Sequence, residues 1–395
     1  MTTLKPCTPY IRPQVAGIEE QQILAVSRLA LGDPSVIPLW YGESGIPTPQ
    51  FICDAAAEAM RAGETFYTHK RGIPELRQTL AGYMGALYGR DVDVERVSVT
   101  ASGMNAIMMM LQCMVDPGDN VIIVSPVWPN AQSAVRLMGG EPRYVTLDPG
   151  PSGWHLDMDK LAAAIDDRTR AIFVNSPNNP TGWMVPADQV AEMLALARER
   201  GIWILADEVY ARMVYDRNAA PSFLEIAEPD DPVIVINSFS KSWAMTGWRM
   251  GWLVHPPEHG DLFGNVIEFN YSCVAQFLQR AGIVAIEEGE PFVAEMLSHC
   301  RRGRDIVDAR LPRLKGIVDY RMPEASFYAF FRIDGVTDSL GFARDLVRGA
   351  HVGIAPGTAF GPGAETWFRL CFAQTEETLN AAFDRLETAL GTAGT

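Results

Sequence analysis

A lysine in a serine-rich turn is the first candidate for covalent chemistry in this sequence. Lys241 ends the segment Ser238-Phe239-Ser240-Lys241, which follows a run of Val and Ile residues. A partly desolvated amine beside cationic groups has a lowered pKa, and the neutral amine can attack an aldehyde to form an imine. We therefore predict that Lys241 forms a Schiff base and moves protons. A solvated surface lysine is the structural alternative.

Two further charged residues lie in apolar stretches that normally exclude charge. Asp207 follows the run Ile202–Ala206, and Arg369 lies within Trp367–Phe372. A buried ion without a partner is costly, so each of these residues needs an opposite charge nearby. A bound cation for Asp207 and a bound anion for Arg369 would meet that need. The alternatives are a helix cap for Asp207 and an internal ion pair for Arg369.

A glycine-containing turn opens a predicted helix and could bind an anion. The backbone amides of Gly103 and Met104 would point outward at the N-terminus of that helix. The hydroxyls of Ser102 and Ser238 and the guanidinium of Arg249 would add donors. Such a turn alone is common, but an arginine can bind two phosphate oxygens at once, so we predict a phosphate site.

The elements that position these residues follow from the apolar pattern between residues 96 and 254. Short runs rich in Val, Ile or Leu alternate with amphipathic stretches, as in βαβ units around a buried parallel sheet. The predicted strands are Arg96–Thr100, Asn120–Ser125, Arg143–Leu147, Ala171–Asn175, Ile202–Ala206 and Val233–Asn237. The predicted helices between them include Asn105–Met114, Asn130–Leu137, Met158–Ala164 and Ala187–Arg198. Because ligands bind at the carboxyl ends of parallel strands, the polar residues after these strands are expected to converge.

After Val254 the pattern changes to helices with few strands. The predicted elements are helical segments over Ile267–Ala285 and Pro291–Leu311, a strand at Phe327–Arg332, a helix at Ser339–Arg348, a strand at Thr366–Phe372 and a helix at Glu376–Leu390. We predict an α/β protein, with a large domain built on a doubly wound, mostly parallel sheet and a smaller α+β domain. The predicted division is 1–45 as an N-terminal arm of the small domain, 46–285 as the large domain and 286–395 as the small domain.

Composition narrows the possible partners. The formal net charge of -15 would repel nucleic acid and anionic membranes, and no apolar stretch is long enough to span a bilayer. The start of the chain lacks the pattern of an export signal, so we expect a cytoplasmic protein. The six cysteines and six histidines are scattered without metal-ligand spacing. We predict no disulfide and no metal site.

Three motifs in a fixed order resemble the class I/II aminotransferases, which are fold-type I enzymes dependent on pyridoxal 5'-phosphate (PLP) in the aspartate aminotransferase superfamily. The motifs are SPNNPTG at 176–182, ADEVY at 206–210 and SFSKSWAMTGWRMG at 238–251. The resemblance extends from Gly42 to Arg369. It implies a PLP cofactor and the two-domain fold described above.

The resemblance also implies roles for single residues. Lys241 would carry PLP, and Asp207 would pair with the pyridine nitrogen and keep the ring an electron sink. Asn179 and Tyr210 would hydrogen-bond the ring hydroxyl oxygen, although in isolation NNPTG is a simple turn. Trp128 would stack on the ring, unless it serves only as a core residue.

The remaining implied contacts concern phosphate and substrate. The phosphate would be held by Ser102, Gly103, Met104, Ser238 and Arg249, and by Tyr67 from a neighbouring subunit. The substrate would be bound by Arg369, Asn179 and Gly45. Arg369 would grip the α-carboxylate with two parallel hydrogen bonds and so fix which Cα bond stands perpendicular to the ring. Sharing of Tyr67 between subunits implies a homodimer.

The sequence departs from the family pattern where the substrate is expected. The segment 41–47 (YGESGIP) replaces the usual GEPDF, and His69, Lys70 and Arg71 stand where relatives carry small or polar residues. Met104 replaces a lysine that recognises the side-chain carboxylate in aspartate-specific bacterial relatives. Either cation at 70–71 could restore such recognition or be a solvated loop charge. An apolar or aromatic pocket shaped by Trp40, Tyr41 and Phe360 is an alternative, as is plain packing.

We predict an aminotransferase that moves an amino group from an L-amino acid to a 2-oxo acid by a ping-pong mechanism. Lys241 would release PLP to the amino acid, move the Cα proton and leave pyridoxamine phosphate for the acceptor. A PLP-dependent β-lyase of the same fold is the first alternative. A ligand-sensing module without catalysis is the second, and the acidic charge and the presence of Lys241 disfavour it.

Overall fold

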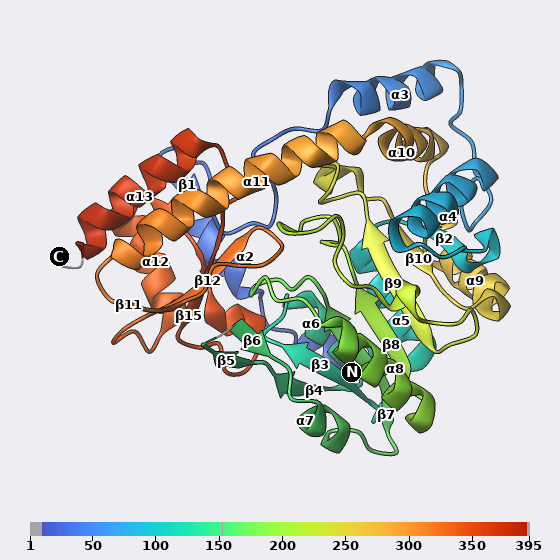
Figure 1. The fold of residues 1–395 in the computed structure, drawn as a ribbon, viewed down its shortest axis with the longest axis horizontal. Coiled ribbons are helices and arrows are strands. Elements are labelled where there is room, and N and C mark those ends of the chain that lie inside the picture. The colour runs from blue at the N-terminus through green and yellow to red at the C-terminus, as the bar shows by residue number, and fades with distance from the viewer. Residues whose placement is uncertain (1–9, 152, 393–395) are drawn as a thin grey trace, which may run out of the picture.

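A seven-stranded sheet forms the centre of the larger part of the molecule (Figure 1). The structure is a computed structural model and describes residues 10–151 and 153–392. In spatial order the strands are β2 (Val97–Thr100), β10 (Gly251–Val254), β9 (Val233–Ser238), β8 (Trp203–Asp207), β7 (Thr169–Asn175), β3 (Asn120–Ser125) and β4 (Glu141–Thr146). All neighbours pair in parallel except β10, which is antiparallel to both β2 and β9. The prediction of a mostly parallel sheet is therefore confirmed.

The strand sequences explain why this sheet is covered on both faces. In β3, Ile122 and Val124 belong to one buried cluster, whereas Val121 and Ile123 belong to a second cluster. Since side chains alternate between the faces of a strand, the two clusters lie on opposite faces of the sheet, and the first also extends into the smaller part of the molecule. Continuous Val and Ile runs are thus stabilised by burial on either side.

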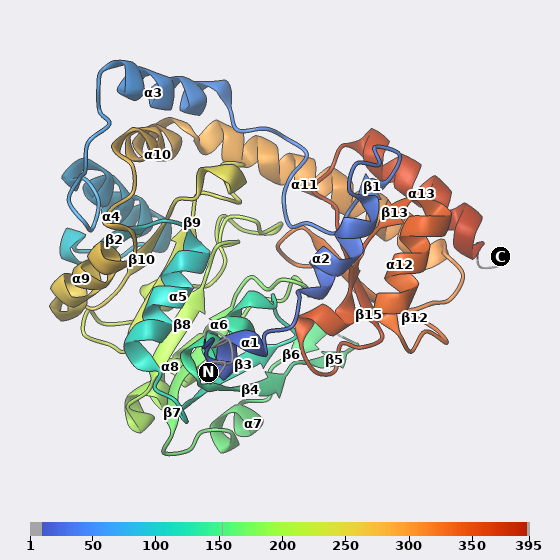
Figure 2. The same cartoon turned by 180° about the vertical axis from the view of Figure 1, so that it is seen from behind.

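Helices cover each face of the sheet. The helices that contribute to the second cluster are α5 (Gly103–Met114), α6 (Asn130–Met138) and α9 (Gly260–Tyr271). Those that contribute to the first cluster include α4 (Pro74–Tyr88), α7 (Met158–Ala163), α8 (Ala187–Arg200) and α10 (Gln276–Glu288). Helix α3 (Gln50–Arg61) lies along α10, and α5 is in front of the sheet when the molecule is seen from behind (Figure 2).

The smaller part is built on an antiparallel sheet of four strands. Their order is β11 (Ile317–Tyr320), β12 (Tyr328–Ile333), β15 (Trp367–Cys371) and β14 (Ala355–Pro356). The helices of this part are α11 (Glu290–Arg310), α12 (Ser339–Ala350) and α13 (Glu376–Leu390). The N-terminal arm joins it, because β1 (Ile37–Pro38) pairs in parallel with β13 (Val352–Gly353) and α2 (Gln22–Ser27) contacts α12. The short remaining elements are α1 (Pro13–Ala16) and the hairpin of β5 (Asp148–Gly150) and β6 (Gly153–His155).

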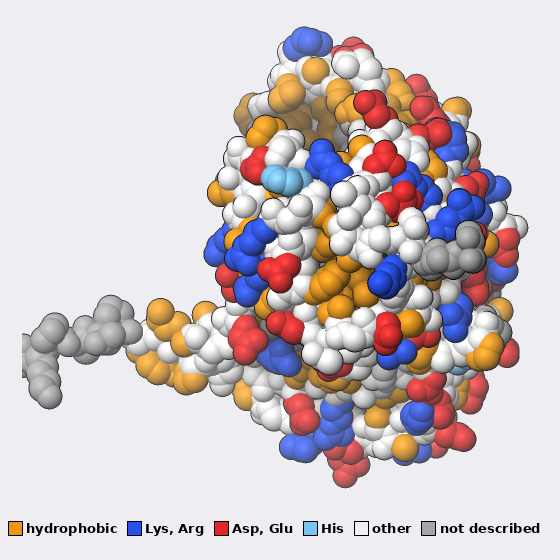
Figure 3. All heavy atoms as spheres, turned by 90° about the vertical axis from the view of Figure 1, so that its left-hand side faces the viewer, with side chains coloured by type: hydrophobic (Ala, Val, Ile, Leu, Met, Phe, Trp, Pro, Cys, Tyr) orange, Lys and Arg blue, Asp and Glu red, His pale blue; other side chains and the backbone are white. Residues whose placement is uncertain are grey.

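The start of the described chain extends away from the body. Figure 3 shows a segment with hydrophobic side chains that projects from one side of the molecule. Tyr10 is 82% exposed and Ile11 is 62% exposed. Solitary apolar residues are normal on a surface, but an apolar arm that projects needs a partner surface to be covered.

The structure corrects the predicted elements in three places. Strand β10 was not predicted, because its four residues follow the turn 246–249 without a periodic pattern of their own. The segment predicted as helical over Ile267–Ala285 contains a break at 272–275, where Ser272 has φ 67°. Helices α3 and α4 have no predicted counterpart, since the alternating pattern begins only at residue 96. In residues 10–151 and 153–392, no helix is long and apolar enough to cross a membrane.

Candidate active site

A cavity of about 300 Å³ lies at the carboxyl ends of the central strands. Strands β7, β8 and β9 deliver residues to it from the large sheet, and β12 and β15 deliver residues from the small sheet. The lining residues are Gln21, Ile23, Trp40, Tyr41, Gly42, Gly103, Met104, Ile107, Trp128, Asn130, Asn175, Asn179, Asp207, Val209, Tyr210, Ser238, Ser240, Lys241, Arg249, Tyr328 and Arg369. Ten of the predicted site residues thus surround one space, while Ser102, Tyr67 and Gly45 do not line it.

Lys241 is held in the cavity by the N-terminal arm. Its Nζ donates a hydrogen bond to the carbonyl oxygen of Gly42 over 2.6 Å. Burial lowers the pKa of Lys241 to about 8, and the positive charge of Arg369 acts in the same direction. Glycine is required at position 42, because a Cβ there would stand 2.0 Å from the Tyr328 hydroxyl. The amine is therefore positioned and partly neutral close to physiological pH.

Asp207 is a buried carboxylate without a cation. It ends β8, is 4% exposed and accepts a long hydrogen bond of 3.4 Å from the amide of Val209. Burial raises the pKa of Asp207 to about 7, and the Val209 amide and Lys241 offset part of that effect. No ion pair reaches this carboxylate within the described residues, and no helix begins beside it. The Asp207 carboxylate would therefore bind a ligand that places a cation at this wall of the cavity.

Arg369 is a buried guanidinium without an anion. It is 2% exposed in β15, where Nη1 donates to Asn179 Oδ1 over 2.9 Å and Nη2 donates to the Trp40 carbonyl oxygen. Its Nε has no hydrogen-bond partner, and no carboxylate pairs with the residue in the described part of the chain. The rings of Tyr328 and Phe360 lie 4.6 Å and 5.0 Å from the guanidinium carbon. A carboxylate from a ligand could supply this missing partner.

The N-terminus of α5 and the turn after β9 form an anion cradle. Gly103, Ser238, Ser240 and Arg249 line the cavity there. Arg249 is exposed and uses Nη1 for the Thr246 carbonyl oxygen, at 2.6 Å. The remaining guanidinium N–H groups, the helix amides and the two hydroxyls could hold a phosphate.

Ser102 and Gly251 lie beside this cradle and stabilise the local structure. The Ser102 hydroxyl accepts from the Asn105 amide and caps α5, rather than facing the cavity. Gly251 lets β10 approach the start of α5, because a Cβ there would lie 2.9 Å from the Gly103 amide nitrogen. Ser240 was not predicted as a site residue, although it stands directly before Lys241 in the serine-rich turn.

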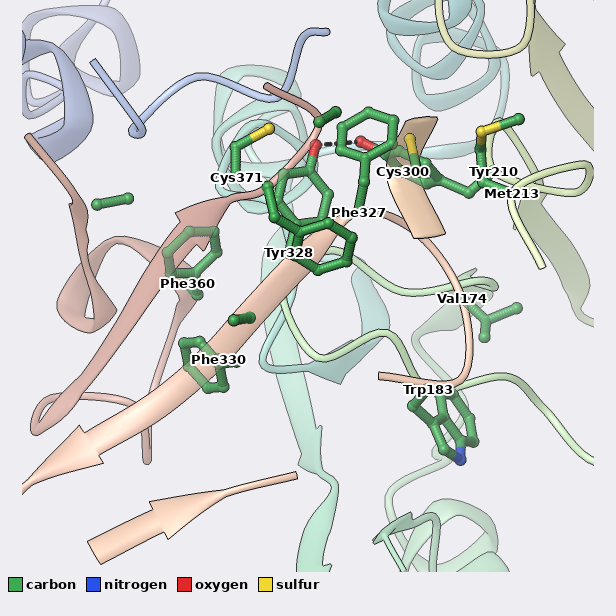
Figure 4. Close-up of a cluster of buried hydrophobic side chains, with 14 of the residues drawn as sticks. Val174, Trp183, Tyr210, Met213, Cys300, Phe327, Tyr328, Phe330, Phe360 and Cys371 are labelled. Carbon is green, nitrogen blue, oxygen red and sulfur yellow. Dashed lines mark hydrogen bonds between the residues drawn. The ribbon is translucent and has the colours of Figure 1, made fainter. Parts of the chain in front are cut away.

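Sequence reasoning missed Tyr328, which connects two predicted residues. Its hydroxyl lies 2.6 Å from the Tyr210 hydroxyl (Figure 4). Its ring lies against the Arg369 guanidinium, whose carbon is 4.6 Å from the ring centroid. Burial raises the pKa of Tyr210 above its ordinary value. A tyrosine inside the apolar strand Phe327–Arg332 was the available signal, because a buried phenol needs a hydrogen-bond partner.

Asn175 was missed as well and orders the Asn179 loop. Its Oδ1 accepts from the Asn179 amide at 2.8 Å, and its Nδ2 donates to the Asp207 carbonyl oxygen at 3.0 Å. Asn175 thus connects the end of β7 to the end of β8. Trp128 is half-buried: it lines the cavity and also packs against the core behind it.

Five predicted or open positions lie elsewhere. Tyr67 is 88% exposed on the surface. Gly45 donates its amide to the Ala373 carbonyl oxygen at 2.7 Å and lines a separate groove, while Gly42 reaches the cavity. Lys70 Nζ is bonded to Asn265 at 2.6 Å, and Arg71 is 4% exposed and bonded to Glu95 and Ser98. Neither cation lines the cavity, and Phe360 lies under Arg369 instead of at the cavity wall.

Chemically, the cavity can hold an aldehyde at Lys241, a ring cation at Asp207, a phosphate at the cradle and a carboxylate at Arg369. These are the groups of PLP and of an amino acid, so the residues present fit that cofactor. The described residues contain no group of three or more His, Cys, Asp or Glu side chains placed to bind a metal ion.

The comparisons with known proteins agree with this geometry. The family model for aminotransferase class I and II matches residues 36–386. Aspartate aminotransferases from Thermotoga maritima and Pyrococcus horikoshii are each 33% identical to this chain; the matches cover 89% and 96% of this chain and 90% and 97% of those proteins.

Solved structures show the same relationship. A Thermus thermophilus aspartate aminotransferase mutant superposes with a TM-score of 0.90 at 31% identity, covering 97% of this chain and 100% of that one. An aromatic aminotransferase from P. horikoshii gives 0.85 at 31% identity, covering 92% of this chain and 98% of that one. The predicted fold type is confirmed. The chain therefore belongs to the aminotransferase class I and II family and is a PLP-dependent transaminase of fold type I.

Proposed function

We propose that Lys241, Asp207 and Arg369 have three separate roles in amino transfer in this cavity: Lys241 attaches the cofactor and moves protons, Asp207 pairs with the ring, and Arg369 binds the substrate carboxylate. The supporting observation is that each is buried or partly buried without the partner it needs: an amine with a pKa of about 8, a carboxylate without a cation and a guanidinium without an anion. Bound PLP supplies a reactive aldehyde carbon and an electron-accepting ring. The cofactor and the substrate would supply the missing charges: Asp207 would pair with the ring nitrogen of PLP, and Arg369 would pair with the α-carboxylate of the substrate.

Lys241 acts both as the attachment point and as the proton carrier. Its neutral form is populated near pH 8, so the amine can attack without a separate strong base. Once the substrate has displaced it, the free amine accepts the proton of the substrate Cα. The Gly42 carbonyl oxygen, 2.6 Å from Nζ, then holds the amine where it can return that proton.

Arg369 and Asn179 set the direction of the substrate. The guanidinium is fixed by Asn179 Oδ1 on one side and by the Trp40 carbonyl oxygen on the other, so it cannot follow a moving ligand. A carboxylate bound there would place the substrate Cα in the cavity that Lys241 also lines. Proton loss is favoured over other bond cleavages for that reason.

The phosphate would be held by the cradle at α5 and β9. Gly103 and Met104 supply amides, Ser238 and Ser240 supply hydroxyls, and Arg249 supplies the countercharge. Trp128 would cover one face of the ring, and Tyr210 with Asn179 would donate to its hydroxyl oxygen. Ser102 contributes indirectly, since its cap fixes the first turn of α5.

Acceptor dependence tests this assignment of chemistry. The holoenzyme and an amino acid alone should give about one equivalent of 2-oxo acid per site, because the amino group stays on the enzyme in a ping-pong reaction. Adding a 2-oxo acid acceptor should then permit many turnovers. Continuous 2-oxo acid production and ammonia release without acceptor would instead identify a β-lyase.

Tyr328 is proposed to hold the Tyr210 hydroxyl in the direction of the cofactor. Replacing Tyr328 by phenylalanine should lower kcat about three- to tenfold, the effect of losing one buried hydrogen bond. The pH midpoint of the visible absorbance of the holoenzyme should also rise, because a weaker donor stabilises the ionised ring oxygen less.

Tyr215→Phe is the matched control for that variant. Tyr215 is a buried tyrosine bonded to the Ser326 carbonyl oxygen at 2.6 Å, and it does not line the cavity. The Tyr215→Phe variant should leave the pH midpoint of the visible absorbance unchanged. An unchanged midpoint in Tyr328→Phe would reduce Tyr328 to a packing residue.

The proposal includes a cytoplasmic homodimer with shared sites. Phe66 and Tyr67, at 79% and 88% exposure, and Phe269 at 85% form apolar surface that a second copy would cover. Tyr67 could then reach the phosphate of the neighbouring site. The cysteines at 53, 113, 273, 300 and 371 are free thiols, as is typical of a reducing compartment, and Cys7 lies outside the described residues.

We also propose that the chain is divided into an N-terminal arm at 1–45, a large domain at 46–285 and a small domain at 286–395. It is supported by the β1–β13 pairing and by the start of α11 at Glu290. The proposed role of Gly45 in substrate binding has no such support, because its amide is used by Ala373. The names of relatives leave the donor open, since aspartate and aromatic aminotransferases both resemble the chain at 31% identity.

A further inference from the structure

We infer that the preferred amino donor carries an apolar side chain and that a second carboxylate is disfavoured; this rests on the proposed function, in which Arg369 binds the α-carboxylate. The inference comes from the charges and the walls of the cavity. It predicts donors such as leucine, methionine and phenylalanine, ahead of aspartate and glutamate.

Each of the described cations that line the cavity already has a proposed role. Among the described lining residues the cations are Lys241, Arg249 and Arg369. The first attaches the cofactor, the second lies at the phosphate cradle and the third binds the α-carboxylate. A dicarboxylate would therefore place its second charge in the cavity without a counter-ion from the described residues of the same chain.

Cations close to the cavity in sequence or space are engaged elsewhere. Arg71 is buried, with hydrogen bonds to Glu95 and Ser98. Lys70 is bonded to Asn265. Arg136 lines the neighbouring groove and contacts the Tyr144 hydroxyl at 3.3 Å. None of the three lines the cavity itself.

The groove beside the cavity adds negative charge. Gln21 and Asn130 line both spaces and are joined by a hydrogen bond of 2.8 Å. Beyond them, the described lining of the groove carries Glu19 and Glu365 against Arg136, while Glu20 is paired with Arg28. A carboxylate that extends past Gln21 would meet this excess of like charge, so the groove offers no second binding site for it.

The remaining wall is apolar and rigid. It comprises Ile23, Trp40, Met104 and Ile107, of which Ile23, Trp40 and Ile107 are 4%, 4% and 1% exposed. The Trp40 ring is fixed against Gly353, where an added Cβ would lie 1.7 Å from the ring. An apolar side chain gains free energy by leaving water for such a wall, whereas an unpaired carboxylate loses it.

Single-turnover reactions test the inference on the holoenzyme. The protein is mixed with one amino acid at a time, without acceptor, and the change in the visible spectrum of the bound cofactor is followed. The second-order rate constant should be at least about tenfold higher for leucine, methionine or phenylalanine than for aspartate or glutamate, as for a buried charge left unpaired. Aspartate or glutamate reacting as fast as the apolar donors would overturn the inference and leave the proposed function intact. A spectrum unchanged by every amino acid would overturn the proposed function itself.

A charge placed on the wall gives an independent readout. Met104→Lys keeps the length of an unbranched side chain and adds a cation, so the ratio of aspartate to leucine rate constants should rise at least about tenfold. Gln112→Lys adds the same charge to the exposed side of α5, outside the cavity, and should leave that ratio unchanged. An unchanged ratio in Met104→Lys would show that this wall does not contact the donor side chain.

Discussion

Replacing Lys241 by alanine is expected to lower turnover by about 10⁴-fold or more, because one amine serves as both nucleophile and proton carrier. The variant should also lose the visible absorbance that PLP acquires when it is attached to the protein. Borohydride treatment of the wild type should leave a pyridoxyl adduct on the peptide that contains Lys241, and the variant should carry none. Absorbance spectra and peptide mass spectrometry measure both effects.

Lys160→Ala is the control for this experiment. Lys160 is an exposed lysine paired with Asp148 at 2.7 Å and lies outside the cavity. Its loss should change neither the spectrum nor the adduct. A small primary amine added to Lys241→Ala should restore part of the proton transfer, since the alanine leaves space beside Gly42. A full visible spectrum in Lys241→Ala would falsify the assignment of this lysine.

Replacing Asp207 by asparagine is expected to lower kcat by about 10²–10⁴-fold. The substitution keeps the size and hydrogen-bonding capacity of the side chain but removes the charge that would pair with the ring nitrogen. Removing one partner of a buried ion pair costs about 3–5 kcal/mol, which corresponds to that range of rate constants. Steady-state kinetics at saturating cofactor separates this effect from weaker PLP binding.

The same substitution should stabilise the protein without its cofactor, in a pH-dependent way. Burial raises the pKa of Asp207 from 3.8 to about 7. A raised pKa means that the folded protein binds the proton more tightly than the unfolded chain, so stability is full below about pH 4 and falls as the pH rises to about 7. Asparagine does not titrate. Relative to wild type, the variant should therefore gain about 2 kcal/mol more in the free energy of unfolding at pH 7 than at pH 5.

Between pH 5 and pH 7, titration of the neighbouring buried acid Glu208 adds little to this difference in the free energy of unfolding. Burial raises the pKa of Glu208 to about 8, so this neighbour stays mostly protonated in both conditions. Asp216→Asn, at an exposed position paired with Arg217, should show no such pH dependence. Urea unfolding of the apoproteins gives the values. Equal stability differences at pH 5 and pH 7 would mean that Asp207 already has a cation or water to stabilise its charge.

The sequence alone determined six of the seven strands of the large sheet and the residues that follow them. Strand β3 was predicted with its observed bounds, Asn120–Ser125, and β7, β8 and β9 within two residues. These predictions succeeded because a run of Val and Ile residues between turn residues is a local signal. The parallel order of such strands then brings their carboxyl ends, with Asp207 and Lys241 beyond them, to one edge.

Only the tertiary structure decided which distant groups complete the site. The contacts of Tyr210 with Tyr328, of Arg369 with Asn179 and of Lys241 with Gly42 join residues 118, 190 and 199 positions apart. No local pattern encodes such pairs, because they depend on how the small sheet and the arm pack against the large sheet. The same packing engages Arg71 away from the cavity and leaves Arg369 without an anion, so the charge available to a substrate is a property of the folded chain.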